Sequence, residues 1–416
     1  MSTNYKQKFE EAIQVTSFEK LSKDKQDFIK TISFRYNFSF QEIKKAIEYS
    51  IDLSMWNETS LENWWSQKNF SKTLQKKNIF KLLDDFILSL RKEPKQYLIE
   101  NTSKPVKQKG KKISIEKSDK KIYGMCPVAS DKTVCCNLRN IDVVENCAFG
   151  CSYCTIQSFY KQSYIFDETF TEKLKAIPLD KNRRYHYCTG QSSDSLVWGN
   201  KNGVMDALIN FAKENPNVIL ELKTKSKNVG HLLKNEIPNN IICSWSLNTN
   251  TIVTNEEHFT AKLSERLEAA RKVADKGIKV SFHFHPIVYY KGWEDEYKEL
   301  VETVIKSFQA KEIAFVSLGT LTFIKPVIKK IRDTGISSKI LQMEFASDPH
   351  GKLTYPDSIK NSLFNKMLSY LEEWRKEVFF YLCMEKREVW EQTIGNPYGT
   401  NEEFEKAILQ ACFDKI

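Results

Sequence analysis

The chain has 416 residues, of which 41% are hydrophobic and 28% charged, and it carries a formal net charge of +10. This composition excludes a disordered chain, and the length suggests two or three domains. No apolar run approaches the roughly 20 residues of a membrane span, and the first residues lack the apolar core of a secretory signal. We therefore expect a cytoplasmic protein without a membrane partner. Its ten cysteines indicate metal or redox use before disulfides.

Residues 1–100 are expected to form a helical N-terminal domain. Ser39 and Glu42 have the spacing of a capping box, and the apolar residues that follow share one helix face, namely Ile43, Ala46, Ile47 and Ile51. A second apolar stretch runs from Ile79 to Leu90. The tryptophans of this region, Trp56, Trp64 and Trp65, are predicted to pack in its core, and base stacking is the alternative.

Residues 101–122 are lysine-rich and contain few apolar residues. The stretch from Lys104 to Lys121 contains eight lysines and two acidic residues, Glu116 and Asp119. We interpret this segment as a solvated linker, with contact to a phosphate backbone as the alternative.

Residues 123–416 are predicted to form an α/β domain, a partial (β/α)6 barrel with a C-terminal helical extension. Short β-rich stretches alternate with helical ones, which is typical of a parallel sheet. Leu263, Leu267, Ala270 and Ala274 share a helix face that ends at Gly277. The expected strands are Leu138–Glu145, Arg184–Thr189, Val218–Lys223, Ile241–Leu247, Lys279–Ile287 and Glu312–Leu318. Ligands of such barrels bind at the C-terminal ends of the strands.

Three cysteines, Cys147, Cys151 and Cys154, follow the first expected strand in a C-x3-C-x2-C spacing. A [4Fe–4S] cluster normally takes four thiolates, so three would leave one iron open to a small molecule. This spacing is the signature of the radical S-adenosyl-L-methionine (SAM) superfamily, in which Tyr153 would lie near the adenine. A zinc site completed by Cys135 or Cys136 is the alternative.

Polar residues follow the next three expected strands. We expect the backbone around Gly190 to hold the amino acid part of SAM and Asp194 to accept hydrogen bonds from its ribose. Lys225 is expected to pair with the SAM carboxylate, and Ser246 and Asn248 offer polar groups to the same ligand. Ordinary turn and strand-end chemistry is the alternative for each of them.

Two further features lie in later strands. His283 and His285 alternate along one strand and face the same side, where an interior role is favoured over a substrate channel or a metal. Cys383 follows an apolar run and is expected to be a buried thiol, with a substrate-side role as the alternative.

From about Cys126 to Trp390, the chain resembles the spore photoproduct lyase family of radical SAM proteins, also called DNA repair photolyase-like. The motifs that carry the resemblance are Cys135-Cys136, residues 150–157, Thr224-Lys225-Ser226, residues 244–248, residues 265–270, residues 317–320 and residues 381–385. The resemblance implies a partial (β/α)6 barrel and cluster ligation by the three cysteines. It implies SAM contacts by Tyr153, Ser193, Asp194, Lys225 and Ser246.

The founding activity of this family is repair of a thymine dimer in spore DNA by the 5′-deoxyadenosyl radical. Its lyases carry a hydrogen-donating cysteine directly before a Thr-Ser-Asp segment. Aligning that Asp with Asp194 puts Gln191 at the cysteine's place. The nearest thiol is Cys188, within the expected strand, so Cys188 and Gln191 are the candidate catalytic residues.

The favoured hypothesis is a radical SAM enzyme, lyase-like, that cleaves SAM reductively at a [4Fe–4S] cluster. DNA or RNA is the candidate substrate, and a flavodoxin or ferredoxin is the expected electron donor. Two alternatives stay open: a zinc-stabilised nucleic-acid-binding protein, and a radical SAM enzyme acting on a protein or small molecule.

Overall fold

The computed structural model describes residues 3–70, 74–97, 112–126, 130–156, 163–395 and 397–416. The chain divides into two compact units, Met1–Pro105 with Phe323–Phe345, and Val106–Thr322 with Ala346–Ile416. Residues Phe323–Phe345 thus group with the N-terminal helices although they lie far along the chain. In the described parts of the chain, no helix is long and apolar enough to cross a membrane.

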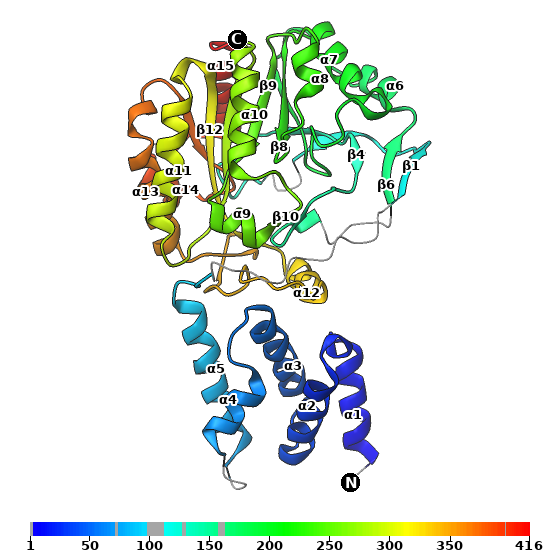
Figure 1. Ribbon diagram of the computed structural model, residues 1–416, viewed down its shortest axis with the longest axis vertical. Coiled ribbons are helices and arrows are strands. Elements are labelled where there is room, and N and C mark those ends of the chain that lie inside the picture. Colours follow the sequence, from blue (N-terminus) through cyan, green and yellow to red (C-terminus); the bar gives the residue numbers. More distant parts are fainter. Residues whose placement is uncertain (1–2, 71–73, 98–111, 127–129, 157–162, 396) are drawn as a thin grey trace. The chain divides into compact units, whose positions relative to one another are not determined.

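The first unit is helical in its described residues. Its helices are α1 (Thr3–Gln14), α2 (Lys23–Tyr36), α3 (Phe40–Met55), α4 (Leu61–Lys68), α5 (Lys76–Lys92) and α12 (Lys325–Asp333), with a 3-10 turn at Phe18–Lys20 (Figure 1). The predicted capping box is present at the start of α3, where the side chain of Ser39 accepts from the Glu42 amide. Trp56, Trp64 and Trp65 are all buried, which confirms the core packing.

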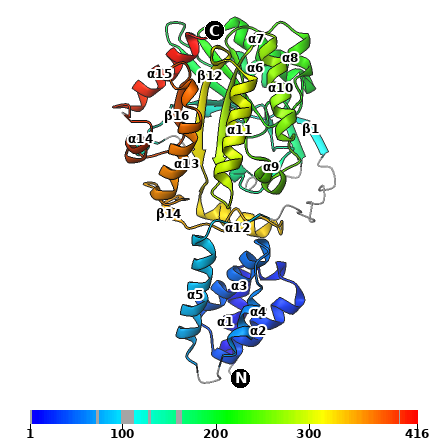
Figure 2. The ribbon, with the colours of Figure 1, turned by 60° about the vertical axis from the view of Figure 1, so that its left-hand side comes forward.

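The second unit is built on a curled eight-stranded sheet, which confirms the predicted half-barrel (Figures 1 and 2). In spatial order its strands are β16 (Phe379–Leu382), β12 (Ile313–Thr320), β11 (Lys279–Ile287), β9 (Ile241–Ser246), β8 (Val218–Thr224), β7 (Tyr185–Thr189), β3 (Arg139–Ile141) and β2 (Tyr123–Met125). All neighbours pair in parallel except β2, which pairs antiparallel with β3.

Helices cover the outside of this sheet; for example, α7 packs on β8, and α10 on β9 and β11. The helices of the unit are α6 (Phe170–Lys175), α7 (Val204–Glu214), α8 (Gly230–Lys234), α9 (Asn250–Glu256), α10 (Leu263–Asp275), α11 (Trp293–Ser307), α13 (Asp357–Tyr370), α14 (Arg387–Thr393) and α15 (Asn401–Phe413). Short 3-10 turns lie at Lys201–Gly203, Ala310–Glu312 and Glu372–Trp374. The apolar face predicted for α10 is buried against the sheet, as Leu263, Leu267, Ala270 and Ala274 all show.

Several short strands lie outside the main sheet. They are β1 (Lys112–Glu116), β6 (Ser163–Asp167) and β4 (Val144–Glu145) in one sheet, the pair β5 (Gly150–Cys151) and β10 (Glu257–His258), and β13 (Thr322–Phe323), β14 (Ala346–Ser347) and β15 (Leu353–Thr354). The first predicted strand, 138–145, is therefore divided between β3 and β4. Its chain leaves the main sheet after Ile141, directly before the cysteine loop.

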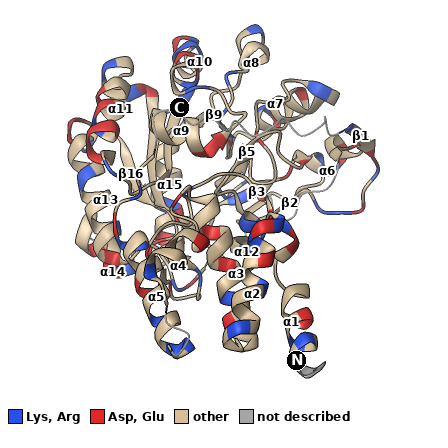
Figure 3. Ribbon diagram, turned by 60° about the horizontal axis from the view of Figure 1, so that its bottom comes forward, with Lys and Arg blue, Asp and Glu red and all other residues tan. Residues whose placement is uncertain are grey.

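The lysine-rich segment lies partly outside the described residues, because 101–111 are not among them. Its next residues, Lys112–Glu116, pair in parallel with β6 as strand β1. Basic and acidic residues are mixed along α2, whereas α11 begins with three acidic residues, Glu294, Asp295 and Glu296 (Figure 3).

A buried carboxylate holds α3 and α12 together in the first unit. Asp52 is fully buried, and its two oxygens lie 2.7 and 2.8 Å from Nε and Nη2 of Arg332. Arg91 Nη2 adds a contact at 3.2 Å. Removing one partner of such a buried pair leaves the other charge without compensation.

We expect Asp52→Ala to lower the free energy of unfolding by about 3–5 kcal/mol, because Arg332 loses its partner. Urea denaturation followed by circular dichroism measures this change. Asp27→Ala is the matched control, since Asp27 forms an exposed pair with Lys23 and should change stability by about 1 kcal/mol or less. Equal effects of the two variants would contradict the assignment.

Candidate active site at the C-terminal strand ends

One pocket of the second unit gathers most of the residues predicted to form the site. The cysteine loop lines one side, and the segments at the ends of β7, β8 and β9 line the other. Its lining consists of Cys147, Phe149, Cys151, Tyr153, Cys154, Ile156, Gly190, Gln191, Ser193, Asp194, Lys223, Thr224, Lys225 and Ser246. Of the predicted site residues, Cys188 and Asn248 are not among these lining residues.

The cysteine loop is anchored by a strand pair. Strand β5 pairs antiparallel with β10, so that Cys151 lies opposite Glu257. The Ser152 amide donates to the Glu256 carbonyl at 2.8 Å, and the Cys154 amide donates back to the Cys151 carbonyl at 3.0 Å. The loop thus takes its shape from backbone hydrogen bonds made by the chain itself.

The three thiols of the loop lie near one another. Cys151 is buried, whereas Cys147 and Cys154 are half-buried. Burial is the main cause that raises the pKa of Cys151 well above its usual value, and Glu257, Cys154 and Cys147 raise it further while Lys225 lowers it. The three thiols therefore lie close together in the pocket lining.

The donor set of the loop, three thiols, is the ligand type that iron–sulfur clusters take. Across the described ranges, no group of three His, Cys, Asp or Glu side chains is arranged to hold one metal ion. Cys135 and Cys136 do not line the pocket and lie near Cys383 instead.

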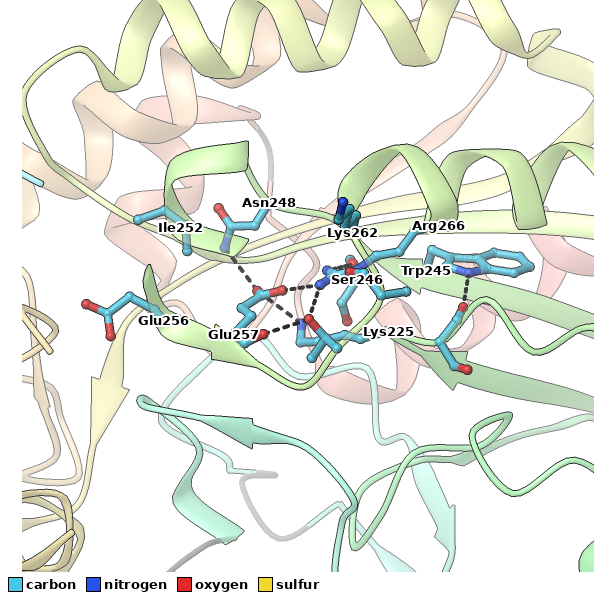
Figure 4. A network of polar contacts seen from close by, with 12 residues as sticks. Lys225, Trp245, Ser246, Asn248, Ile252, Glu256, Glu257, Lys262 and Arg266 are labelled. Atoms are coloured by element: carbon cyan, nitrogen blue, oxygen red, sulfur yellow. Dashed lines mark hydrogen bonds and ion pairs between the residues drawn. The ribbon is translucent and has the colours of Figure 1, made fainter. Parts of the chain in front are cut away.

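The buried carboxylate of Glu257 is the centre of the polar network beside the loop (Figure 4). Its Oε2 lies 2.6 Å from Arg266 Nη2, and its Oε1 lies 3.5 Å from Lys225 Nζ. The Tyr153 hydroxyl donates to Oε1 as well. Burial would raise the pKa of Glu257, but Arg266, Lys225 and the Tyr153 hydroxyl hold it at about 2, so this side chain is an anion.

Arg266 extends this network to the end of β9. Its Nη1 donates to the Ser246 carbonyl at 2.9 Å, and its Nε donates to the Ala261 carbonyl at 2.9 Å. Ser246, predicted to contact the ligand, is thereby fixed on the pocket wall. Sequence reasoning gave no role to Glu257 or Arg266, because Glu257 has no motif near it and meets Tyr153 and Lys225 only through the fold.

Asp194 joins the loops that follow β7 and β8. Its Oδ2 accepts from the Lys225 amide at 2.7 Å, and its Oδ1 accepts from the amides of Leu196 and Val197 at 3.0 and 2.9 Å. The Thr224 hydroxyl also donates to it, at 2.8 Å. Asp194 lines the pocket as predicted, and within the protein it shapes the pocket wall.

Gly190 lies where the chain leaves β7 and needs to be a glycine. Its φ is +96°, and a Cβ at this position would lie 2.6 Å from the Lys223 carbonyl oxygen. The two strand ends therefore approach each other closely beside the pocket. Ser193, next along the loop, accepts from Trp198 Nε1 at 3.1 Å.

The remaining predicted residues have structural contacts. Cys188 is fully buried within β7, and its thiol donates to the Thr189 carbonyl at 3.0 Å. Asn248 is fully buried, donates to the Pro286 carbonyl at 2.9 Å and accepts from the Tyr297 hydroxyl at 2.6 Å. Gln191 lines the pocket, so it is the member of the predicted catalytic pair that reaches it.

The two strand histidines face the barrel interior. His283 Nε2 lies 2.7 Å from Glu221 Oε1, and His285 Nε2 lies 2.8 Å from the Ser317 hydroxyl. Burial lowers the pKa of His283 to about 4, so it is neutral at physiological pH. These contacts agree with the interior role favoured from the sequence.

The family model for spore photoproduct lyase matches residues 134–375. The chain belongs to the spore photoproduct lyase family. The spore photoproduct lyase of Clostridium acetobutylicum is 22% identical over 248 residues, which cover 56% of this chain and 74% of that protein. The lyase of Geobacillus sp. (strain Y412MC61) is 24% identical over 245 residues, covering 56% and 72%. Membership makes the chain an enzyme of the radical SAM lyase type.

Solved structures of spore photoproduct lyase share the fold. One, a double mutant with bound AdoMet (SAM) and dinucleoside spore photoproduct, gives a TM-score of 0.54 at 19% identity and covers 64% of this chain and 81% of its own. Another, a complex with dinucleoside spore photoproduct, gives a TM-score of 0.51 at 21% identity and covers 58% and 75%. This likeness supports the barrel assignment for this chain.

We expect Glu257→Gln to destabilise the protein by about 3–5 kcal/mol, because Arg266 is fully buried and would lose its anionic partner. The measurement is urea denaturation at neutral pH. Glu265→Gln provides the control, since Glu265 pairs with Lys227 at the surface and loss of its charge should change stability far less. A Glu257→Gln protein as stable as the control would show that the carboxylate is not needed.

Proposed function

We propose that this chain binds a [4Fe–4S] cluster on Cys147, Cys151 and Cys154 and cleaves SAM reductively in the adjoining pocket. The proposal is supported by the meeting of these three thiols with the polar strand ends around one pocket. The three cysteines leave one iron without a protein thiolate, and this iron would face the pocket. When bound, the reduced cluster and SAM supply a 5′-deoxyadenosyl radical.

The chain's own residues position the ligand. Lys225 offers its ammonium to the SAM carboxylate, and the anion of Glu257, 3.5 Å away, holds that ammonium in place. Tyr153, whose hydroxyl donates to Glu257, presents its ring to the adenine. Gly190 brings backbone groups close to the amino acid part, because no side chain separates it from β8.

The other predicted contacts follow the same wall. Ser193 and Ser246 line the pocket and offer hydroxyls to SAM. Asp194 faces the ribose and also holds the loop after β8 through the Lys225 amide. Asn248 does not contact the ligand but holds the segment after β9 through its hydrogen bond to the Pro286 carbonyl. The side chains of Phe149 and Ile156 add apolar surface to the pocket lining.

We further propose a damaged pyrimidine in DNA as the substrate. The support is family membership, together with solved relatives whose titles record bound dinucleoside spore photoproduct. A one-electron donor such as a flavodoxin or ferredoxin would reduce the cluster. In this proposal the unit of Met1–Pro105 and Phe323–Phe345 is a helical domain, and the unit of Val106–Thr322 and Ala346–Ile416 is the catalytic barrel, in the cytoplasm.

The cofactor proposal predicts that anaerobically purified protein contains iron and sulfide and that, with dithionite and SAM, it forms 5′-deoxyadenosine. Cys151→Ala should abolish this product, because the cluster loses one of its three ligands. Cys243→Ala is the matched control, since Cys243 is a buried thiol of β9 outside the pocket lining. Zinc without sulfide, and no cleavage of SAM, would instead support a zinc-stabilised binding protein.

The substrate proposal predicts that DNA binding weakens steeply as salt is added, because contacts to phosphates release counterions. Fluorescence anisotropy with an irradiated duplex, measured over a series of KCl concentrations, gives the slope. The undamaged duplex is the comparison, since recognition of a lesion adds affinity that the backbone alone does not supply. No binding of either duplex at low salt would remove nucleic acid as substrate and favour a protein or small molecule.

A further inference from the structure

A small sheet next to the cysteine loop in the sequence ends in a strand with an unpaired outer edge. The sheet has the order β1-β6-β4, and β1 (Lys112–Glu116) pairs in parallel with β6. In the described parts of the chain, no strand pairs with the other side of β1, which lies at the margin of the second unit (Figure 1). Such an edge presents backbone N–H and C=O groups to which a further strand can bind.

The chain that follows β1 is held in place, so this edge has a fixed shape. Lys173 of α6 donates to the Lys120 carbonyl at 2.9 Å and also to the Ser118 carbonyl. Lys120 in turn pairs with Glu145 of β4, at 2.6 Å between Nζ and Oε1. These contacts tie the segment to a helix and to the opposite edge strand of the small sheet. An incoming strand would therefore meet a preformed edge, and less chain has to be ordered on binding.

One face of β1 leaves apolar side chains in water. Ile113 and Ile115 point to the same side of the strand, and they are 43% and 58% exposed. Their partners on β6 are Tyr164 and Phe166. Both of these rings pack on Trp198, with centroid distances of 4.7 and 5.7 Å. The apolar layer that Trp198 covers at β6 thus continues to β1, where it is open to solvent.

The sequence of β1 is complementary to itself when two copies run antiparallel. The strand reads Lys112-Ile-Ser-Ile-Glu116. With Ser114 of the two copies opposite each other, Lys112 of each copy lies opposite Glu116 of the other, and Ile113 lies opposite Ile115. Opposite charges and apolar pairs directly across an antiparallel ladder are stabilising. The isoleucines of both copies would then share one face, beside the covered rings of β6.

Other arrangements of two β1 strands are less favourable. A parallel pair in register places Lys112 beside Lys112 and Glu116 beside Glu116, and like charges opposite each other are destabilising. A shift of the antiparallel pair by one residue brings the apolar face of one copy beside the polar face of the other. A shift by two residues in either direction takes Glu116 out of line with Lys112. The register centred on Ser114 is the one that satisfies both the charges and the apolar face.

We propose that two copies of this chain associate through β1 into a dimer with two-fold symmetry. The two edges join by antiparallel pairing centred on Ser114, and the two small sheets become one continuous sheet. The contact is isologous, since both copies contribute the same residues, and it closes at two copies. This inference does not rest on the proposed function.

The dimer would place two cysteine loops on one sheet. Strand β4 ends at Glu145, shortly before Cys147, and β6 begins at Ser163, after Cys154. The small sheet therefore brackets the cysteine loop along the chain. Joining two of these sheets links the segments from which both loops leave and to which they return.

The small size of the contact sets the expected strength of association. Each copy contributes a strand of five residues. Specific and stable interfaces bury about 1,200–2,000 Å² in total, and a single pair of short strands lies at or below the low end of this range. We therefore expect a dimer that dissociates on dilution.

Analytical ultracentrifugation of the full chain, purified anaerobically, tests the proposal over a series of protein concentrations. The mean mass of the wild type should rise from that of one chain toward that of two. Lys112→Glu places acidic side chains opposite each other at both ends of the ladder and should raise the dissociation constant about tenfold or more. Addition of Glu116→Lys restores opposite charges across the ladder, so the double variant should associate like the wild type.

Two further variants separate pairing at β1 from other causes. Lys234→Glu makes the same change of charge at an exposed residue of α8 and should leave association unchanged. Ile115→Lys should weaken association, because it removes the apolar pairs across the ladder. A wild type that stays a single chain up to about 100 µM would overturn the proposal. So would a Lys112→Glu protein that associates like the wild type, or a double variant that does not recover association.

Discussion

The carboxylate of Glu257 is the interaction on which the rest of the site depends. A fully buried anion is stable only when cations and hydrogen-bond donors compensate it, and here Arg266, Lys225 and Tyr153 do so from three separate parts of the chain. Lys225 and Tyr153 line the pocket, and Arg266 holds the end of β9. The same contacts that neutralise the Glu257 carboxylate therefore also fix the geometry of the site. Loss of the carboxylate would remove contacts of the cysteine loop, of the segment after β8 and of Arg266, which holds the end of β9, at the same time.

Parallel strand order explains why so many polar groups meet there. Successive strands β7, β8 and β9 end at the same edge of the sheet, so the loops that leave them begin side by side. Asp194 adds a direct tie between two of these loops through the Lys225 amide. The pocket wall is thus assembled from ordinary strand ends that are held in register by the sheet.

The fold and most of the pocket could be predicted because their signals are local. Strand and helix periodicity located the barrel elements, and the cysteine spacing located the loop that pairs with β10. The contacts of Glu257 and Arg266 could not be predicted, since each partner lies in a different element and no spacing links them. The grouping of Phe323–Phe345 with the N-terminal helices could not be predicted either, because it depends on contacts between residues far apart in the sequence, such as Asp52 with Arg332.

The pairing of β5 with β10 has a consequence for how the protein is made. Ser152 contacts Glu256 across a separation of 104 residues, so the cysteine loop has no partner strand until that distant segment has left the ribosome. Domains fold as they emerge from the N-terminal side, and during this interval the three thiols belong to an unattached loop of the nascent chain. Insertion of the proposed cluster into a shaped site therefore has to follow synthesis of β9 and of α9, the helix after it. Cells that make this protein need to protect these thiols from oxidation and from competing metals until then.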